Sequence, residues 1–216
     1  MAARLLTPQH LLLLLVLAAG SRAALGLGAV EDTCTKATAG GKRADLAPFC
    51  VSSLQVAPGS DGADARGLAA IATNLTLANY TAAVAAVKAL QLRGGWSPAE
   101  RAALATCRTR YIEALNVVHS AVHALATGRA RDYAADMAVV QSAATDCERA
   151  FEGAGAGKEE AAWESPMRKV DEDAVNLTTV AMLIKTTQRP LALLCVTMMV
   201  VSWLEGRLGI IEPQTL

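Results

Sequence analysis

The sequence contains few aromatic residues and has no excess of either charge. Two Phe, three Trp and three Tyr are its only aromatic residues among 216, and 20 basic residues balance 20 acidic ones. Sheet cores are usually rich in aromatic and β-branched side chains, so a core of Ala, Leu, Val and Met favours packed helices. The charge balance, with no basic stripe along the chain, argues against a nucleic-acid-binding protein.

Motifs for catalysis or metal binding are also missing. The chain has no G-x-S-x-G segment and no phosphate-binding glycine loop. His119 and His123 lie four residues apart, but His-Ser-Ala-Val-His lacks the glutamate of a zinc protease, and we predict an exposed pair. Asp132, Asp136 and Asp146 could pair for glycoside hydrolysis, yet polar helix surfaces commonly carry such residues. We therefore predict no enzyme, no cofactor and no metal.

The N-terminus has the pattern of a secretory signal peptide. Arg4 precedes an unbroken apolar run over 11–19, and Ser21 and Ala23 are small residues placed for cleavage after Ala23. The run is shorter than the roughly 20 residues that a membrane span needs. We predict that residues 1–23 are a signal peptide and that the remaining chain is secreted.

Four stretches carry apolar residues at the alternating three- and four-residue spacing of a packed helix face. Turn and capping residues separate them: Gly94–Gly95, a capping box over Ser97–Glu100, Gly128, and Ser165–Pro166, with Pro190 after the last. Short connections between long helices imply antiparallel neighbours, which predicts an all-α, up-down-up-down four-helix bundle. The stripes are Leu68, Ile71, Leu75, Ala78, Ala82, Ala85, Ala89; Leu104, Cys107, Tyr111, Ala114, Val118, Ala121, Leu125; Tyr133, Met137, Val140, Ala144, Cys147, Phe151; and Val170, Ala174, Leu177, Ala181, Ile184.

Five cysteines allow at most two disulfides within the chain. Cys107 and Cys147 lie on facing stripes at equal distances from the Gly128 turn, so an antiparallel hairpin would place them side by side. Cys34 and Cys50 precede the bundle and could staple a short hairpin, which leaves Cys195 over. Spacing alone does not fix connectivity, and other pairings stay open at this point.

The motifs around these cysteines resemble those of the plant invertase and pectin methylesterase inhibitor family, over roughly residues 31–188. The segments that carry the resemblance are Asp32-Thr33-Cys34, Phe49-Cys50-Val51-Ser52-Ser53-Leu54, Ala103-Leu104-Ala105-Thr106-Cys107, Thr145-Asp146-Cys147-Glu148-Arg149-Ala150-Phe151-Glu152 and residues 176–184. The resemblance implies a secreted four-helix bundle, here within 24–188, preceded by an N-terminal helical hairpin. It also implies disulfides paired first to second and third to fourth.

The resemblance further implies a monomer that blocks the cleft of a cell-wall carbohydrate enzyme in a one-to-one complex in the apoplast. Invertase inhibitors use a Pro-Lys-Phe segment near the turn that here reads Gly128–Tyr133, so pectin methylesterase is favoured as the target, with acid invertase as the alternative. A secreted four-helix signalling ligand would share the same features and is the alternative of another class. Outward polar residues of the second and third bundle helices are candidate partner contacts: Glu113, Asn116, Asp132 and Asp136.

Two further features stand apart from the bundle pattern. Asn74, Asn79 and Asn176 begin glycosylation sequons, and Asn176 is the best candidate because it points away from its apolar stripe. The tail of 189–216 holds fourteen largely apolar residues over 191–204, too few for a span, and charged residues follow them, unlike a lipid-anchor signal. Its role is unassigned, and we expect membrane contact only if this tail inserts.

Overall fold

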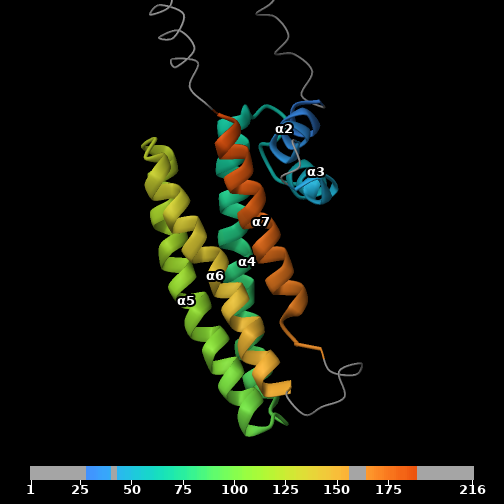
Figure 1. Ribbon diagram of the computed structural model, residues 1–216, viewed down its shortest axis with the longest axis vertical. Coiled ribbons are helices and arrows are strands. Elements are labelled where there is room, and N and C mark those ends of the chain that lie inside the picture. The colour runs from blue at the N-terminus through green and yellow to red at the C-terminus, as the bar shows by residue number, and fades with distance from the viewer. Residues whose placement is uncertain (1–27, 40–42, 156–163, 189–216) are drawn as a thin grey trace, which may run out of the picture.

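Four long helices lie side by side in the computed structural model, which describes residues 28–39, 43–155 and 164–188. They are α4 (Ala65–Arg93), α5 (Pro98–Ala126), α6 (Ala130–Gly155) and α7 (Arg168–Thr187). Figure 1 shows them as an elongated bundle, which confirms the predicted all-α, up-down-up-down fold. The predicted signal peptide, the 189–216 tail and Cys195 lie outside the described residues.

A small helical hairpin sits at one end of the bundle, beside α7 (Figure 1). It consists of α2 (Ala29–Thr38), the short helix η2 (Ala44–Leu46) and α3 (Ala47–Gln55). The Cys34–Cys50 disulfide joins α2 to α3 with a Cα–Cα distance of 5.8 Å. Both half-cystines and Leu54 are fully buried in one core with residues of the bundle end. The disulfide-stapled hairpin before the bundle is therefore confirmed.

Local capping chemistry sets the ends of the bundle helices. The Asp64 carboxylate accepts from the Gly67 N–H at the start of α4, and Ser97 and Glu100 form the predicted capping box of α5. Gly94 and Gly128 have φ of 70° and 74°, conformations that glycine adopts without strain, and each stands where a helix must end. The sequence predicts that Ser165–Pro166 begins the last helix directly. In the structure, α7 starts at Arg168, and in the turn before it the Ser165 hydroxyl accepts from the Met167 N–H.

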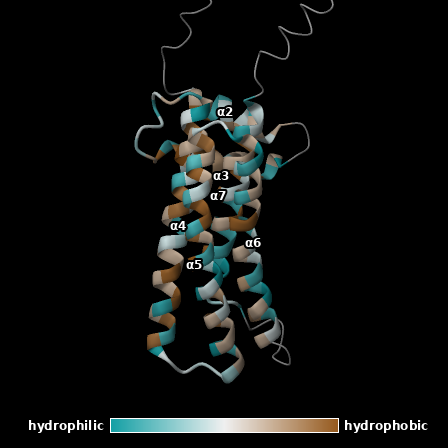
Figure 2. Ribbon diagram, turned by 90° about the vertical axis from the view of Figure 1, so that its left-hand side faces the viewer, coloured by the Kyte–Doolittle hydropathy of each residue, from teal (hydrophilic) through white to brown (hydrophobic). Residues whose placement is uncertain are grey.

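The stripes of α5 and α6 are confirmed, since every residue predicted for them is buried. The α4 stripe was wrong beyond Leu68: Ile71 and Leu75 are half-buried, and Ala78, Ala82, Ala85 and Ala89 are exposed. An alanine-rich helix offers little apolar contrast, and the larger Tyr80 and Val87 define its buried face instead. Hydrophilic and hydrophobic residues alternate along the helices, as expected of helices with one buried side (Figure 2).

The second disulfide fixes the register of the central helix pair. Cys107 of α5 and Cys147 of α6 are bonded across 40 residues of sequence, with a Cα–Cα distance of 4.5 Å. These two helices have the most extensive contact of any pair among the described elements. By length and composition alone, α4 could cross a membrane, but here it contributes Leu68, Tyr80 and Val87 to the core.

Candidate functional site

A network of ion pairs crosses from α5 to α6 on the bundle surface. Arg110 Nη1 lies 3.0 Å from Glu113 Oε2 on its own helix, and Arg110 Nε lies 3.4 Å from Asp146 Oδ2 of α6. Arg149 Nη1 approaches the other Asp146 oxygen at 2.6 Å. Near the other end of the pair, exposed Asp132 binds Arg129 at 2.9 Å. We call the surface marked by Arg110, Glu113, Asp132, Val139 and Asp146 the α5–α6 face.

The structure separates the four predicted partner contacts into different environments. Glu113, Asn116 and Asp132 are exposed, whereas Asp136 is half-buried and its Oδ2 has no hydrogen-bond partner. The Cys107–Cys147 register places Glu113 opposite residue 141, so Glu113 and Asp132 stand about 14 Å apart along the bundle. They therefore mark an extended surface and form no compact cluster. Their role as contacts stays a prediction.

Sequence reasoning missed three members of this surface. Arg110 and Asp146 were not proposed as contacts, although they flank the two half-cystines and lie at nearly equal distances from Gly128. That symmetry could have paired them once the disulfide was assigned. Val139 was also missed, and 52% of it is exposed in the middle of α6.

The residues considered for catalysis or metal binding do not assemble into such a site. His119 and His123 are both exposed, as predicted, and the cluster of potential metal ligands found among the described residues does not include them. Asp132 and Asp146 are each engaged by an arginine.

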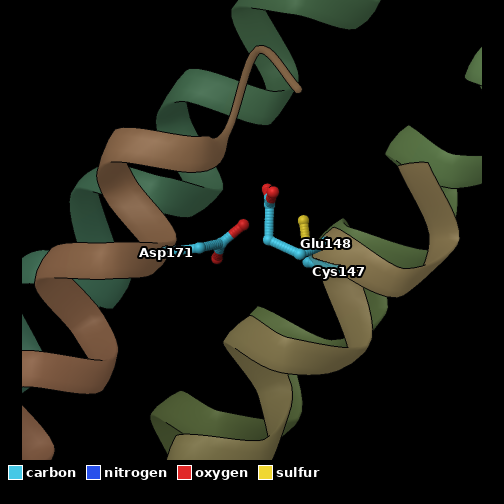
Figure 3. Close-up of side chains that lie close together, drawn as sticks. All are labelled: Cys147, Glu148 and Asp171. Carbon is cyan, nitrogen blue, oxygen red and sulfur yellow. The ribbon is translucent and has the colours of Figure 1, made fainter. Parts of the chain in front are cut away.

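A buried polar cluster lies between α6 and α7. Asp171 of α7 is only 2% exposed, and Figure 3 shows it approaching Glu148 and Cys147 of α6. One oxygen atom each of Asp171 and Glu148 and the sulfur of Cys147 lie within 4.8 Å of one another. Because the Cys147 sulfur is bound in the disulfide, it offers no thiolate to a metal ion.

Hydrogen bonds hold the members of this cluster in place. The buried Tyr111 hydroxyl donates to Asp171 Oδ1 at 2.6 Å and lies 2.9 Å from the Cys147 sulfur. The Ser165 hydroxyl donates to Glu148 Oε1 at 2.6 Å. Burial raises the pKa of Asp171 to about 8; the Tyr111 hydrogen bond opposes this rise, and Glu148 adds to it. Burial, followed by the Asp171 charge, also raises the pKa of Tyr111 above its ordinary value.

A solvent-open groove of about 390 Å³ lies over this cluster. Its walls include the charged side chains Glu148, Arg149, Glu152, Asp171 and Glu172. Seven residues before Glu148 in α6, the side-chain amide of Gln141 donates to Thr179 Oγ1 of α7 at 2.8 Å. The contact between α6 and α7 therefore adds polar interactions to the apolar core that both helices share, whereas a disulfide joins α5 to α6.

The three sequons differ in accessibility from the expected order. Asn176, expected to be the most accessible, is half-buried and lines the groove between α6 and α7, whereas Asn74 is exposed. Asn79 is half-buried, and its side-chain amide donates to the Val170 carbonyl at 3.5 Å. Asn74 is thus the best placed for a glycan, and attachment at any of them stays a prediction.

Comparisons with known proteins agree with this architecture. Residues 28–184 match the model of a family described as plant invertase/pectin methylesterase inhibitor. A protein named "Putative invertase inhibitor" from Platanus orientalis is 29% identical over 158 residues, which cover 72% of this chain and 86% of the relative. A protein of the same name from Platanus acerifolia is 29% identical over 166 residues, covering 76% and 87% of the two chains.

Two solved structures share the fold. A mutant form of a pectin methylesterase inhibitor from Arabidopsis superposes with a TM-score of 0.54 at 19% identity, covering 65% of this chain and 88% of the other. A pectin methylesterase inhibitor from Arabidopsis thaliana gives a TM-score of 0.50 at 17% identity, covering 73% and 96%. At such identities the superpositions establish the fold alone.

Proposed function

Because the chain belongs to the plant invertase/pectin methylesterase inhibitor family, we propose that it is a secreted inhibitor, itself without enzymatic activity. It would bind a cell-wall carbohydrate enzyme one-to-one in the apoplast and block that enzyme's cleft. The observation that carries the proposal is the family match over residues 28–184, which spans the hairpin and all four bundle helices. The predicted signal peptide supports a secreted protein.

The proposed mechanism is steric. Two disulfides and a closely packed helix pair hold the surface residues in place before binding, so little conformational entropy is lost when the complex forms. The α5–α6 face would lie against the enzyme, with the charges of Arg110, Glu113 and Asp146 at the contact and exposed Val139 among them. Charge complementarity there would steer the encounter and set specificity.

Pectin methylesterase is the target that we propose first. The turn between α5 and α6 is short, reads Thr127-Gly128-Arg129, and lacks the Pro-Lys-Phe segment that the family resemblance associates with invertase inhibitors. Acid invertase is the second candidate, supported by the names of the two Platanus relatives. A signalling ligand would use the same bundle without affecting either enzyme.

The deciding experiment titrates the purified, oxidised full-length chain into a plant pectin methylesterase and an acid invertase at mildly acidic pH. Loss of one activity at a near-equal molar ratio supports inhibition and identifies the target. If both enzymes keep full activity while the chain is folded with both disulfides, the proposal fails and the signalling function takes its place.

A matched pair of variants then tests the surface. Asp132→Lys reverses a charge on the α5–α6 face, whereas Glu172→Lys makes the same change on an exposed position of α7. We expect Asp132→Lys to weaken inhibition about tenfold, which corresponds to about 1.4 kcal/mol, and Glu172→Lys to change it less than about twofold. Equal effects of the two variants would place the contact elsewhere on the bundle.

A further inference from the structure

The buried carboxyl group of Asp171 presents a problem of hydrogen bonding. Its Oδ1 accepts from the Tyr111 hydroxyl, but its Oδ2 is buried and finds no hydrogen-bond donor among the residues that the structure describes. An unsatisfied buried acceptor is costly, and an unsatisfied buried charge more so. A carboxylate oxygen of Glu148 on α6 lies within 4.8 Å of a carboxylate oxygen of Asp171, and an ionised Glu148 can only accept.

A single proton resolves this arrangement. If Asp171 carries a proton on Oδ2, that oxygen becomes a donor and Glu148 becomes its acceptor, while Oδ1 still accepts from Tyr111. Glu148 is already oriented by the Ser165 hydroxyl. Without the proton, two carboxylates from neighbouring helices face each other at short range and repel.

We propose that Asp171 and Glu148 form a proton-dependent contact that holds α7 against α6, closed when Asp171 is protonated and loosened when it ionises. The bond that forms is Oδ2–H to a Glu148 carboxylate oxygen, and the proton leaves to solvent through the groove above the pair. The inference concerns the stability of the bundle and does not depend on which enzyme the chain binds.

Among the residues that the structure describes, no ion pair joins Asp171 or Glu148 to a basic side chain. From α5, Tyr111 contributes a neutral donor, and from α4 the buried Tyr80 hydroxyl donates to the Val140 carbonyl. On α6, Arg149 lines the groove but binds Asp146, and on α7 Lys169 binds Asp173. Glu152 and Glu172 also line the groove and add negative charge.

The direction of the pH effect follows from linkage. The pKa of Asp171 is raised to about 8 in the folded chain by burial and, to a lesser extent, by Glu148, while an unfolded aspartate titrates near 4. The folded state therefore binds more protons than the unfolded state between these values. The stabilisation is complete below about pH 4 and is lost as the pH rises to about 8.

The test measures thermal unfolding of the oxidised full-length chain between pH 5 and pH 8. We expect the midpoint to fall by roughly 5–10 °C over this range. Asp171→Asn keeps a donor and an acceptor but cannot ionise, so it should lose most of this dependence. Glu172→Gln changes the exposed neighbour and should follow the wild-type curve. Equal pH slopes for Asp171→Asn and the wild type would overturn the proposal.

Two further measurements test the proposal independently of the Asp171→Asn unfolding curve. If Asp171→Asn does not fold, NMR of the wild-type chain with ¹³C-labelled aspartate carboxyls should show one group titrating well above the rest, and its absence would overturn the proposal. Millimolar Ca²⁺ at pH 8 tests the same carboxylates as a cation site. Stabilisation of the wild type but not of Asp171→Asn by Ca²⁺ would assign the pair to a metal ion and overturn the proton-dependent contact.

Discussion

The two contacts made by α6 differ in kind. Toward α5 it is held by a disulfide, a shared apolar core that includes Tyr111, Val140 and Phe151, and a turn of three residues. Toward α7 it shares the same apolar core, and the described contacts also include the polar pair Asp171–Glu148 and the hydrogen bond from Gln141. No disulfide joins α6 to α7 among the described residues. Both sides are packed through apolar side chains, but only the α5 side is also fixed covalently.

With the function and the pH-dependent contact proposed above, this difference would separate recognition from regulation within one bundle. A surface that blocks an enzyme must be rigid, and the α5–α6 face lies on the covalently fixed pair. A contact that responds to pH must be able to loosen without unfolding the whole chain, and the contact between α6 and α7 has that character. Variants that act on one side and spare the other therefore test the comparison.

The largest effect is expected from removing the disulfide between α5 and α6. Replacing both Cys107 and Cys147 by Ala should cost about 4 kcal/mol of unfolding free energy, because the bond closes a loop of about 40 residues in the unfolded chain. Denaturant unfolding would measure it. The Cys34→Ala, Cys50→Ala variant is the control and should cost about 3 kcal/mol, and a larger loss there would place the main covalent support in the hairpin.

Tyr111→Phe comes next because it removes a buried hydroxyl that contacts both Asp171 of α7 and the Cys147 sulfur of α6. Asp171 Oδ1 would lose its partner, and we expect a loss of about 2 kcal/mol at pH 5. The hydroxyl lowers the pKa of Asp171, so its removal should raise that pKa and shift the decline in stability to higher pH. Unfolding at several pH values would measure both effects. An unchanged pH profile would show that Tyr111 does not act on Asp171.

Gln141→Ala should weaken the contact between α6 and α7 alone. It removes the half-buried hydrogen bond to Thr179, worth about 1 kcal/mol, and leaves the disulfide intact. The control Ser142→Ala changes an exposed hydroxyl that bonds only within α6 and should cost less than about 0.5 kcal/mol. Hydrogen exchange should increase in α7 and stay unchanged in α5, and the reverse pattern would contradict the comparison.

The smallest effect on stability is expected from Arg110→Gln. It breaks the ion pairs to Glu113 and Asp146, but these groups are partly exposed and the disulfide already joins the two helices. A loss below about 1 kcal/mol is expected from thermal unfolding at low and high salt. A loss of several kcal/mol would mean that charge, and not the covalent bond, holds the pair.

The α5–α6 hairpin could be predicted from the sequence because its information is local and symmetric. Cys107 and Cys147 lie at equal distances from Thr127 in the turn beside Gly128, and Tyr111 and Phe151 mark unambiguous buried faces. The rotation of α4 about its own axis could not be predicted, because alanines occur on every side of that helix. Its buried Thr73 and Thr76 read as polar, although each hydroxyl is satisfied by the carbonyl four residues before it.

The pairing of Asp171 with Glu148 was equally beyond the sequence. A long connection separates α6 from α7, so no symmetry sets their relative height, and both residues look like ordinary surface carboxylates on their helices. Asp171 is buried in the folded bundle, where it lies close to Tyr111 of α5 and to Cys147 and Glu148 of α6. The partner contacts have the same difficulty, since exposure alone does not distinguish a binding residue from a solvated one.

The position of the Cys107–Cys147 bond also bears on survival among extracellular proteases. Residues 127–132, which form the turn between α5 and α6 and the start of α6, are all exposed. They include Arg129 and Arg131, the kind of site at which trypsin-like enzymes cut. A single cut there leaves both halves joined through the disulfide some twenty residues away on each side. A nicked molecule would thus keep its two central helices together, and with them the α5–α6 face, until it meets a reductant.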